Sequence, residues 1–159
     1  MTEDEQRQAV VKEALDWVGT KYHHMGTIKK SIKPDGTVDK GGVDCATLLN
    51  EVYSRTGMID REAVEYYPID WHKHNHAERY LNRVMTYSVE ISEEKVKPGD
   101  VVLYKFGLAY AHGAIVINPG WPSIVHAPWT SRMVHADTGN MGVLEEAPRR
   151  FFTLWGNKS

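Results

Sequence analysis

The chain has 159 residues, of which 42% are hydrophobic and 25% charged, and its formal net charge is −2. This length favours one domain, residues 1–159, burying about two-thirds of the unfolded chain's surface. The small negative charge gives no electrostatic reason to expect nucleic acid as a partner, and a single cysteine cannot form an internal disulfide. No apolar run approaches membrane-spanning length. The acidic start of the chain, Met1 to Gln6, predicts synthesis in the cytoplasm without a secretory signal.

The first half of the chain has the periodicity of helices. Apolar residues share one helical stripe from about Glu3 to Val18, and Gly19 follows as a stop. The polar stretch 29–42 contains the turn Pro34-Asp35-Gly36, which predicts a small hairpin or a flexible flap. Two more helices are expected, from Cys45 to Gly57 and from about Asn75 to Met85.

The second half has the pattern of β-structure after Pro98-Gly99-Asp100. Short apolar runs separated by Gly and Pro turns predict strands at 101–104, 114–117, 123–126 and 151–155. A run of helices followed by a run of strands indicates an α+β fold, in which N-terminal helices pack on a C-terminal antiparallel sheet.

The one cysteine, Cys45, lies where a glycine turn leads into a predicted helix. The unpaired N–H groups and the dipole of a helix N-terminus favour negative charge, so this position predicts a stabilised thiolate, which is the nucleophilic form. A lone cysteine is more often a buried core residue, but packing alone requires neither Gly41-Gly42 nor a helix start. Asp44 is expected to cap the helix, because a carboxylate beside the thiol opposes its ionisation.

Two histidines are candidate partners for this thiol. His112 opens an expected strand after the loop 107–111, and His126 lies on the next expected strand, about 5 Å away in a hairpin. Nucleophilic catalysis needs a base for the thiol and a polar group that orients the base. A single strand histidine is usually structural, but two of them together with Cys45 predict a cysteine hydrolase. His135, in Val134-His135-Ala136, repeats the surroundings of His126 and remains the alternative third residue.

Five short motifs resemble those of the NlpC/P60 cysteine peptidases, a papain-like family. The family's nucleophile motif is close to Asp-Cys-Ser-Gly-Leu, and here the chain reads Asp44-Cys45-Ala46-Thr47-Leu48. The order and rough spacing of the motifs agree over about residues 9–127. The other four motifs are Gly19-Thr20-Lys21-Tyr22, Lys97-Pro98-Gly99-Asp100, His112-Gly113-Ala114-Ile115 and Val125-His126-Ala127.

This resemblance implies a papain-like fold and hydrolysis of an amide in peptidoglycan stem peptides, commonly the bond between D-glutamate and a diamino acid. By the family pattern, Cys45 is the nucleophile, His112 the general base and then acid, and His126 the residue that orients His112. Tyr22 helps to hold the oxyanion with the backbone N–H of Cys45; its alternative role is that of a core tyrosine. The resemblance implies no cofactor.

The segment 67–72, followed by Glu78-Arg79-Tyr80-Leu81, resembles the phage-encoded branch of the family. That branch implies a place in the virion, phage tail-tip proteins as partners and action at the bacterial cell wall. Two departures from the family bear on the substrate. Ala46-Thr47 replaces Ser-Gly after the nucleophile, which puts bulkier side chains near the thiol, and an insertion from about Met25 to Lys40 could wall off one end of the cleft.

Two alternatives belong to other functional classes. If their segment were a strand, His72, His74 and His76 would share one face. If it were a helix, His72 and His76 would have the i, i+4 spacing of zinc ligands, with Glu78 nearby. A polar surface segment is the simpler interpretation, because no further ligand completes the site. The chain could also be an inactive wall-peptide-binding or structural tail-tip protein. The thiol, both histidines and Tyr22 argue against that hypothesis, since a binding protein needs no nucleophile.

Overall fold

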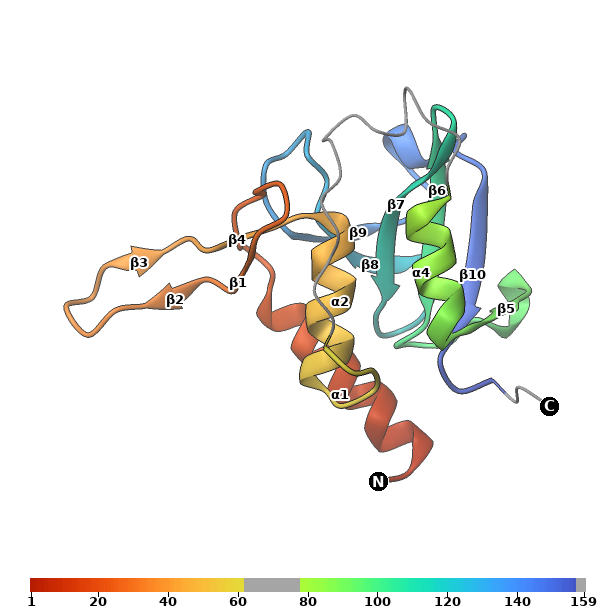
Figure 1. Ribbon diagram of the computed structural model, residues 1–159, viewed down its shortest axis with the longest axis horizontal. Coiled ribbons are helices and arrows are strands. Elements are labelled where there is room, and N and C mark those ends of the chain that lie inside the picture. Colours follow the sequence, from red (N-terminus) through yellow and green to blue (C-terminus); the bar gives the residue numbers. More distant parts are fainter. Residues whose placement is uncertain (62–77, 157–159) are drawn as a thin grey trace.

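The computed structural model describes residues 1–61 and 78–156, and shows helices packed on an antiparallel sheet (Figure 1). The predicted α+β fold is therefore confirmed. The described α-helices are α1 (Glu3–Asp16), α2 (Cys45–Arg55) and α4 (Arg79–Tyr87). The six-stranded sheet has the order β5-β10-β6-β7-β8-β9, and its neighbouring strands are antiparallel. Its strands are β5 (Val89–Ile91), β6 (Val101–Phe106), β7 (Ala109–Val116), β8 (Ser123–His126), β9 (His135–Thr138) and β10 (Arg149–Thr153).

The helices lie close to their expected positions. Gly19 and Gly57 both have positive φ, at 91° and 77°, and each follows the end of a helix, as expected for a glycine stop. Helix α4 begins at Arg79, and the start expected near Asn75 lies outside the described residues. None of the described helices is long and apolar enough to cross a membrane.

The sheet corrects two expectations. Residues 109–111 belong to β7 rather than to a loop, because the chain turns at Gly107 and pairs again with the end of β6. His112 therefore lies inside a strand, next to a bulge between Tyr104 and Lys105, and does not open it. The sequence did not predict strands β5 and β9, since β5 has only three residues and the sequence of β9 is mostly polar.

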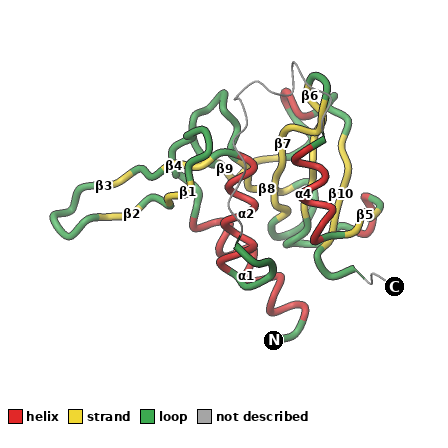
Figure 2. Tube along the Cα trace, viewed as in Figure 1, coloured by secondary structure: helices red, strands yellow, loops and turns green. Residues whose placement is uncertain are grey.

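The insertion forms a hairpin arm. Strand β1 (Thr27–Ile28) pairs with β4 (Gly42–Val43), and β2 (Ser31–Ile32) pairs with β3 (Val38–Asp39). The tube in Figure 2 shows that β2 and β3 extend away from the sheet. The hairpin prediction is confirmed. The expectation that this insertion walls off one end of the cleft stays a prediction.

The two faces of the sheet carry different cores. Along each strand, alternate residues point to opposite faces. One face packs against the helices, through Leu103 and Ile115 of the sheet and Leu48 and Val52 of α2. The other face gathers Val102, Tyr104, Ala114, Val116, Ile124 and Phe151.

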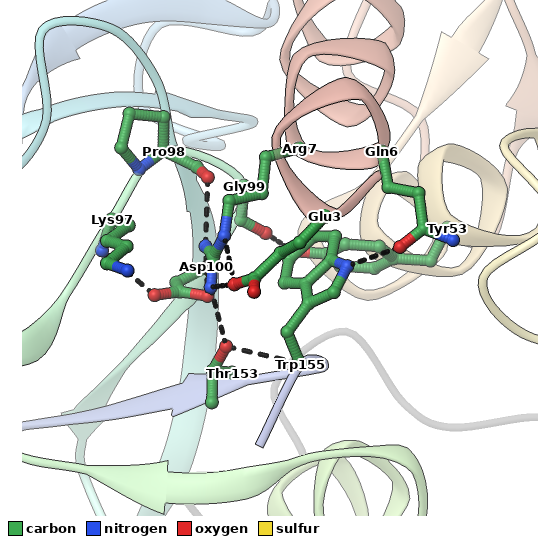
Figure 3. Close-up of polar contacts among 10 residues, drawn as sticks. All are labelled: Glu3, Gln6, Arg7, Tyr53, Lys97, Pro98, Gly99, Asp100, Thr153 and Trp155. Atoms are coloured by element: carbon green, nitrogen blue, oxygen red, sulfur yellow. Dashed lines mark hydrogen bonds and ion pairs between the residues drawn. The ribbon is translucent and has the colours of Figure 1, made fainter. Parts of the chain in front are cut away.

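A buried ion pair fastens α1 to the sheet (Figure 3). The Arg7 guanidinium donates to Asp100 Oδ1 at 2.9 Å and to the carbonyl of Pro98 at 3.1 Å. Asp100 Oδ2 in turn accepts from the backbone N–H of Lys97, and the Tyr53 hydroxyl of α2 donates to the Gly99 carbonyl at 2.7 Å. The Pro-Gly-Asp motif therefore joins two helices to the first residues of β6.

Candidate active site

The glycine turn brings the chain into α2 at Cys45. Gly41 has a φ of 65°, and a Cβ there would overlap the backbone of residues 28–30, so glycine is required. Asp44 is the N-cap, as expected: its side chain accepts from the N–H groups of Ala46 at 3.0 Å and Thr47 at 2.9 Å. The buried carboxylate also accepts from the N–H of Met25 at 2.8 Å, which fixes the start of the insertion to the helix start.

Two backbone groups of β7 lie against the sulfur of Cys45. The thiol donates to the Ala111 carbonyl oxygen, with a sulfur–oxygen distance of 3.3 Å. The N–H of Gly113 also interacts with the sulfur. Tyr80 of α4 donates its hydroxyl to the Cys45 carbonyl at 3.0 Å, and a Cβ on Gly113 would overlap that hydroxyl. A glycine after His112 therefore lets β7, α2 and α4 meet at the thiol.

These surroundings hold the thiol in its protonated form. Burial, and then the charge of the Asp44 carboxylate, raise the pKa of Cys45 to about 12, although the N–H groups of Gly113, Ala46 and Cys45 act to lower it. The expectation of a stabilised thiolate is wrong for this structure. The helix N-terminus does act in the expected direction, but desolvation outweighs it.

Strands β7, β8 and β9 line up His112, His126 and Asp137. The Nε2 of His112 lies 2.8 Å from the Nδ1 of His126, and the Nε2 of His126 lies 3.2 Å from Asp137 Oδ2. His126 is buried, whereas the Asp137 side chain is 55% exposed. The rings of Tyr104 and Phe106 flank His112 at centroid distances of 5.9 and 6.1 Å.

Both imidazoles are neutral in this setting. Burial lowers the pKa of His112 to about 3, with a further contribution from His126. Burial also lowers the pKa of His126, although the hydrogen bond and charge of Asp137 oppose this. Burial acts to raise the pKa of Asp137, but the Thr138 N–H and His126 outweigh it, so the pKa is lowered and the group is a carboxylate.

The thiol and the imidazole pair approach β7 differently. The sulfur contacts the backbone on either side of residue 112, on the strand face packed against α2. His112 pairs with Tyr104 and His126 with Ala114, on the face that carries the second core. Cys45 and His112 are both among the described residues, and the structure has no hydrogen bond between their side chains. Proton transfer from Cys45 to His112 therefore stays a prediction.

The other expected site residues also gather here. Tyr22 pairs with Val43 beside the glycine turn, and its N–H donates to the Arg132 carbonyl at 2.8 Å. Burial, then the charges of Cys45 and Asp44, raise the pKa of its phenol, which places it near the thiol. Its role at the oxyanion is untested by this geometry.

His135 lies directly across from His126 in the β8–β9 pair. The two ring nitrogens of His126 are taken by His112 and Asp137. This arrangement favours His126 over His135 as the residue that orients His112, although its catalytic role remains a prediction.

Sequence reasoning missed two residues of the site. Asp137 lies eleven positions after His126, and only the register of β8 with β9 brings the two together. Tyr80 lies within the helix expected from about Asn75 to Met85, and no motif marked its hydroxyl. In the part of the chain that the structure describes, no group of three or more His, Cys, Asp or Glu residues could hold a metal ion. The alternative zinc site at His72, His74 and His76 lies outside that part.

Comparisons place the chain among known proteins. Among solved structures, the NlpC/p60 domain of the peptidoglycan hydrolase SagA is 19% identical with a TM-score of 0.54, covering 91% of this chain and 96% of that one. The P60 domain of an antigen from M. avium subspecies paratuberculosis is 12% identical with a TM-score of 0.61, covering 97% and 98%. An N-acetylmuramoyl-L-alanine amidase from Bacteroides uniformis is 11% identical with a TM-score of 0.52, covering 93% and 98%.

Identities this low show a shared fold. No curated protein matches the chain significantly. Residues 19–149, which include the thiol and both histidines, match the NlpC/P60 family. The chain therefore belongs to the NlpC/P60 family.

Proposed function

We propose that residues 1–159 form one catalytic domain, a cysteine hydrolase that cleaves the amide between D-glutamate and a diamino acid in peptidoglycan stem peptides. Membership of the NlpC/P60 family supports this reaction class, as do similar folds named peptidoglycan hydrolase and amidase. One observation carries the proposal: the sulfur of Cys45 contacts the carbonyl immediately before His112, whose imidazole continues into His126. The peptide bond itself is inferred from the family resemblance.

The proposed reaction starts from a neutral thiol and a neutral imidazole. As the sulfur attacks the peptide carbonyl carbon, the thiol proton moves to Nδ1 of His112, and the carbonyl oxygen becomes an oxyanion. The N–H of Cys45 and the hydroxyl of Tyr22 stabilise that oxyanion. His112 then gives its proton to the leaving amine as the C–N bond breaks, which leaves a thioester. Water attacks the thioester as His112 takes a proton from it, and His112 then gives that proton to the sulfur as the C–S bond breaks, which restores the thiol and releases the carboxylic acid.

Purified muropeptides of known structure test the proposal. The wild-type protein should release a new diamino acid amine and a new D-glutamyl carboxylate, identified by mass spectrometry. The Cys45→Ala variant should release neither product, while Asp35→Asn, on the exposed arm, serves as an active control. New termini elsewhere in the glycan or peptide would refute the proposed bond, and equal cleavage by Cys45→Ala would refute the nucleophile.

A second candidate function is binding of wall peptide without cleavage. The raised pKa of Cys45 and the thiol's hydrogen bond to Ala111, rather than to an imidazole, favour it. The discriminating result is saturable binding of muropeptides by the wild-type protein with no new termini after prolonged incubation. Such a result would replace the hydrolase proposal.

We further propose that the protein acts at the cell wall as part of a phage particle, in contact with tail-tip proteins. Support comes from the resemblance of residues 67–72 and 78–81 to the phage-encoded branch; residues 67–72 lie outside the described part of the chain. Mass spectrometry of purified particles from the bacterium that carries the gene should detect the protein in virions. Its presence only in the cell lysate would contradict a virion location.

A further inference from the structure

We propose that Asp137 is a positioning residue that sets the tautomers of both imidazoles and so keeps the lone pair of His112 on Nδ1. The inference rests on the proposed hydrolase and adds to it a residue and a defined proton acceptor. Two hydrogen-bond distances and the chemistry of imidazole carry it.

The first step fixes His126. A carboxylate only accepts hydrogen bonds, so the contact of 3.2 Å between Asp137 Oδ2 and His126 Nε2 requires a proton on that nitrogen. The other carboxylate oxygen, Oδ1, accepts from the Thr138 N–H at 2.8 Å, which holds the carboxylate in place. More than half of the Asp137 side chain is exposed, so water continues to stabilise its charge.

The second step fixes His112. A neutral imidazole has one N–H and one lone pair, so Nδ1 of His126 is an acceptor once its Nε2 carries the proton. The partner at 2.8 Å is Nε2 of His112, which must therefore donate. The lone pair of His112 is then on Nδ1, and this nitrogen has no hydrogen-bond partner among the described residues.

Without the Asp137 carboxylate, the two imidazoles would no longer be held in these tautomers. His126 could then carry its proton on Nδ1, facing Nε2 of His112, and His112 would move its own proton to Nδ1 to keep the hydrogen bond. A protonated Nδ1 cannot take the proton of Cys45. The same two hydrogen bonds also stabilise the imidazolium that His112 forms during the reaction, because its Nε2–H donates towards His126 and the charge of Asp137.

Among the titratable groups near His126, Asp137 is the one that sets its tautomer. The titratable groups around His126 are His112 on β7 and His135 and Asp137 on β9. Tyr104 on β6 lies against His112 instead, and its hydroxyl donates to the Gly139 carbonyl at 2.6 Å. His135 opposes a positive charge on His126. In the described structure, only Asp137 gives His126 an acceptor at Nε2.

Nitrogen-15 NMR of the histidine rings tests the proposal without an activity assay. In the wild-type protein at pH 7, His112 and His126 should both carry their proton on Nε2. In Asp137→Ala, one or both rings should shift towards the Nδ1–H tautomer. Unchanged tautomers in Asp137→Ala would overturn the proposal. Asp35→Asn is the matched control, because it neutralises an exposed carboxylate on the arm.

The amide variant sharpens the test. Asp137→Asn can turn its NH₂ towards Nε2 of His126 and impose the reverse tautomers, so we expect its kcat to fall at least as far as that of Asp137→Ala. In chymotrypsin-like proteases the Asp-to-Asn change lowers kcat by about 10⁴-fold. Here Asp137 acts on His112 through a second imidazole, so we expect a smaller loss of kcat, about 10²-fold or more. KM should change little, and Asp137→Glu should recover part of the rate. Wild-type kcat in Asp137→Asn would refute the proposal.

The result separates this proposal from the hydrolase proposal. A wild-type protein that cleaves no muropeptide, but has both rings in the Nε2–H tautomer and loses that order in Asp137→Ala, would refute the hydrolase and keep the tautomer order. A wild-type protein that cleaves muropeptides, with ring tautomers that stay the same in Asp137→Ala, would keep the hydrolase proposal and refute the tautomer order. Thermal unfolding of each variant shows whether it is folded, and Asp137→Glu supplies a second variant if Asp137→Ala is not.

Discussion

The thiol of Cys45 donates a hydrogen bond to the carbonyl oxygen of Ala111, so the proposed nucleophile of α2 is held by the residue immediately before His112. This contact satisfies the thiol in its protonated form. It also places the sulfur against the peptide group that links Ala111 to His112, the proposed base. In the resting state, therefore, the thiol is neutral and bonded to a backbone carbonyl, and His112 is a neutral imidazole on the other face of β7.

The ionisation of Cys45 gives the first prediction. Because burial and Asp44 raise its pKa to about 12, the alkylation rate with iodoacetamide should keep rising with pH well above 8. Cys45 is the only cysteine, so intact mass spectrometry reports this site alone. A rate that levels off near pH 7 would show a stabilised thiolate and contradict the structure. An Asp44→Asn variant should react faster at a given pH, provided that thermal unfolding shows it folded.

The stability of the fold should depend on pH through His112. Its pKa is about 3 when folded and about 6.5 in an unfolded chain, so between these values the unfolded state binds more protons. The free energy of unfolding should therefore fall as the pH drops from about 6.5 to 3, by up to about 1.4 kcal/mol per pH unit for this group. Urea unfolding of wild type and His112→Asn at several pH values measures this. An equal slope in both proteins would contradict it.

The ion pair of Arg7 and Asp100 should be a large contributor to stability. The Asp100 side chain is fully buried, and Asp100→Ala would leave the buried Arg7 guanidinium with a single ion-pair partner among the described residues, Glu3, whose side chain is 49% exposed. We expect a loss of about 3–5 kcal/mol in the free energy of unfolding. Asp35→Asn on the exposed arm should change it by only about 0.5 kcal/mol. Losses of similar size in the two variants would refute this role for the pair.

Gly113 should tolerate no side chain. A Cβ there would overlap the Tyr80 hydroxyl, which holds the Cys45 carbonyl. Gly113→Ala should cost about 1–3 kcal/mol of stability, as other overpacked sites do, and should reduce hydrolysis by moving α4 or β7. Combining it with Tyr80→Phe removes the overlapping oxygen and should restore part of the stability. A double variant less stable than the sum of both single changes would contradict the proposed clash.

The two candidate third residues can be separated by substitution. His126→Ala should lower kcat by about 100-fold or more, because His112 loses its hydrogen-bond partner. His135→Ala should have a mild effect, since His126 has both nitrogens occupied by other groups. A severe loss at His135 with a mild loss at His126 would reverse the assignment.

Sequence periodicity was sufficient for the main helices, for the strands around His112 and His126, and for Asp44 as the N-cap. It could not locate β9, because His135-Ala136-Asp137-Thr138 has no apolar alternation and becomes a strand only by pairing with β8. The Asp137 contact depends on that same register. The prediction of a stabilised thiolate at Cys45 was wrong for a similar reason. The helix start is visible in the sequence, but the burial that outweighs its effect on the pKa comes from the packing of β7 and α4 around Cys45.

The most direct test of the proposed chemistry is intact-protein mass spectrometry during turnover of a D-glutamyl–diamino acid muropeptide. We predict a transient acyl adduct that maps to Cys45 in the wild-type protein, with its formation slowed by orders of magnitude in His112→Ala. Peptide cleavage that persists in Cys45→Ala, or an adduct that forms equally fast without His112, would contradict the proposed transfer of the thiol proton to His112.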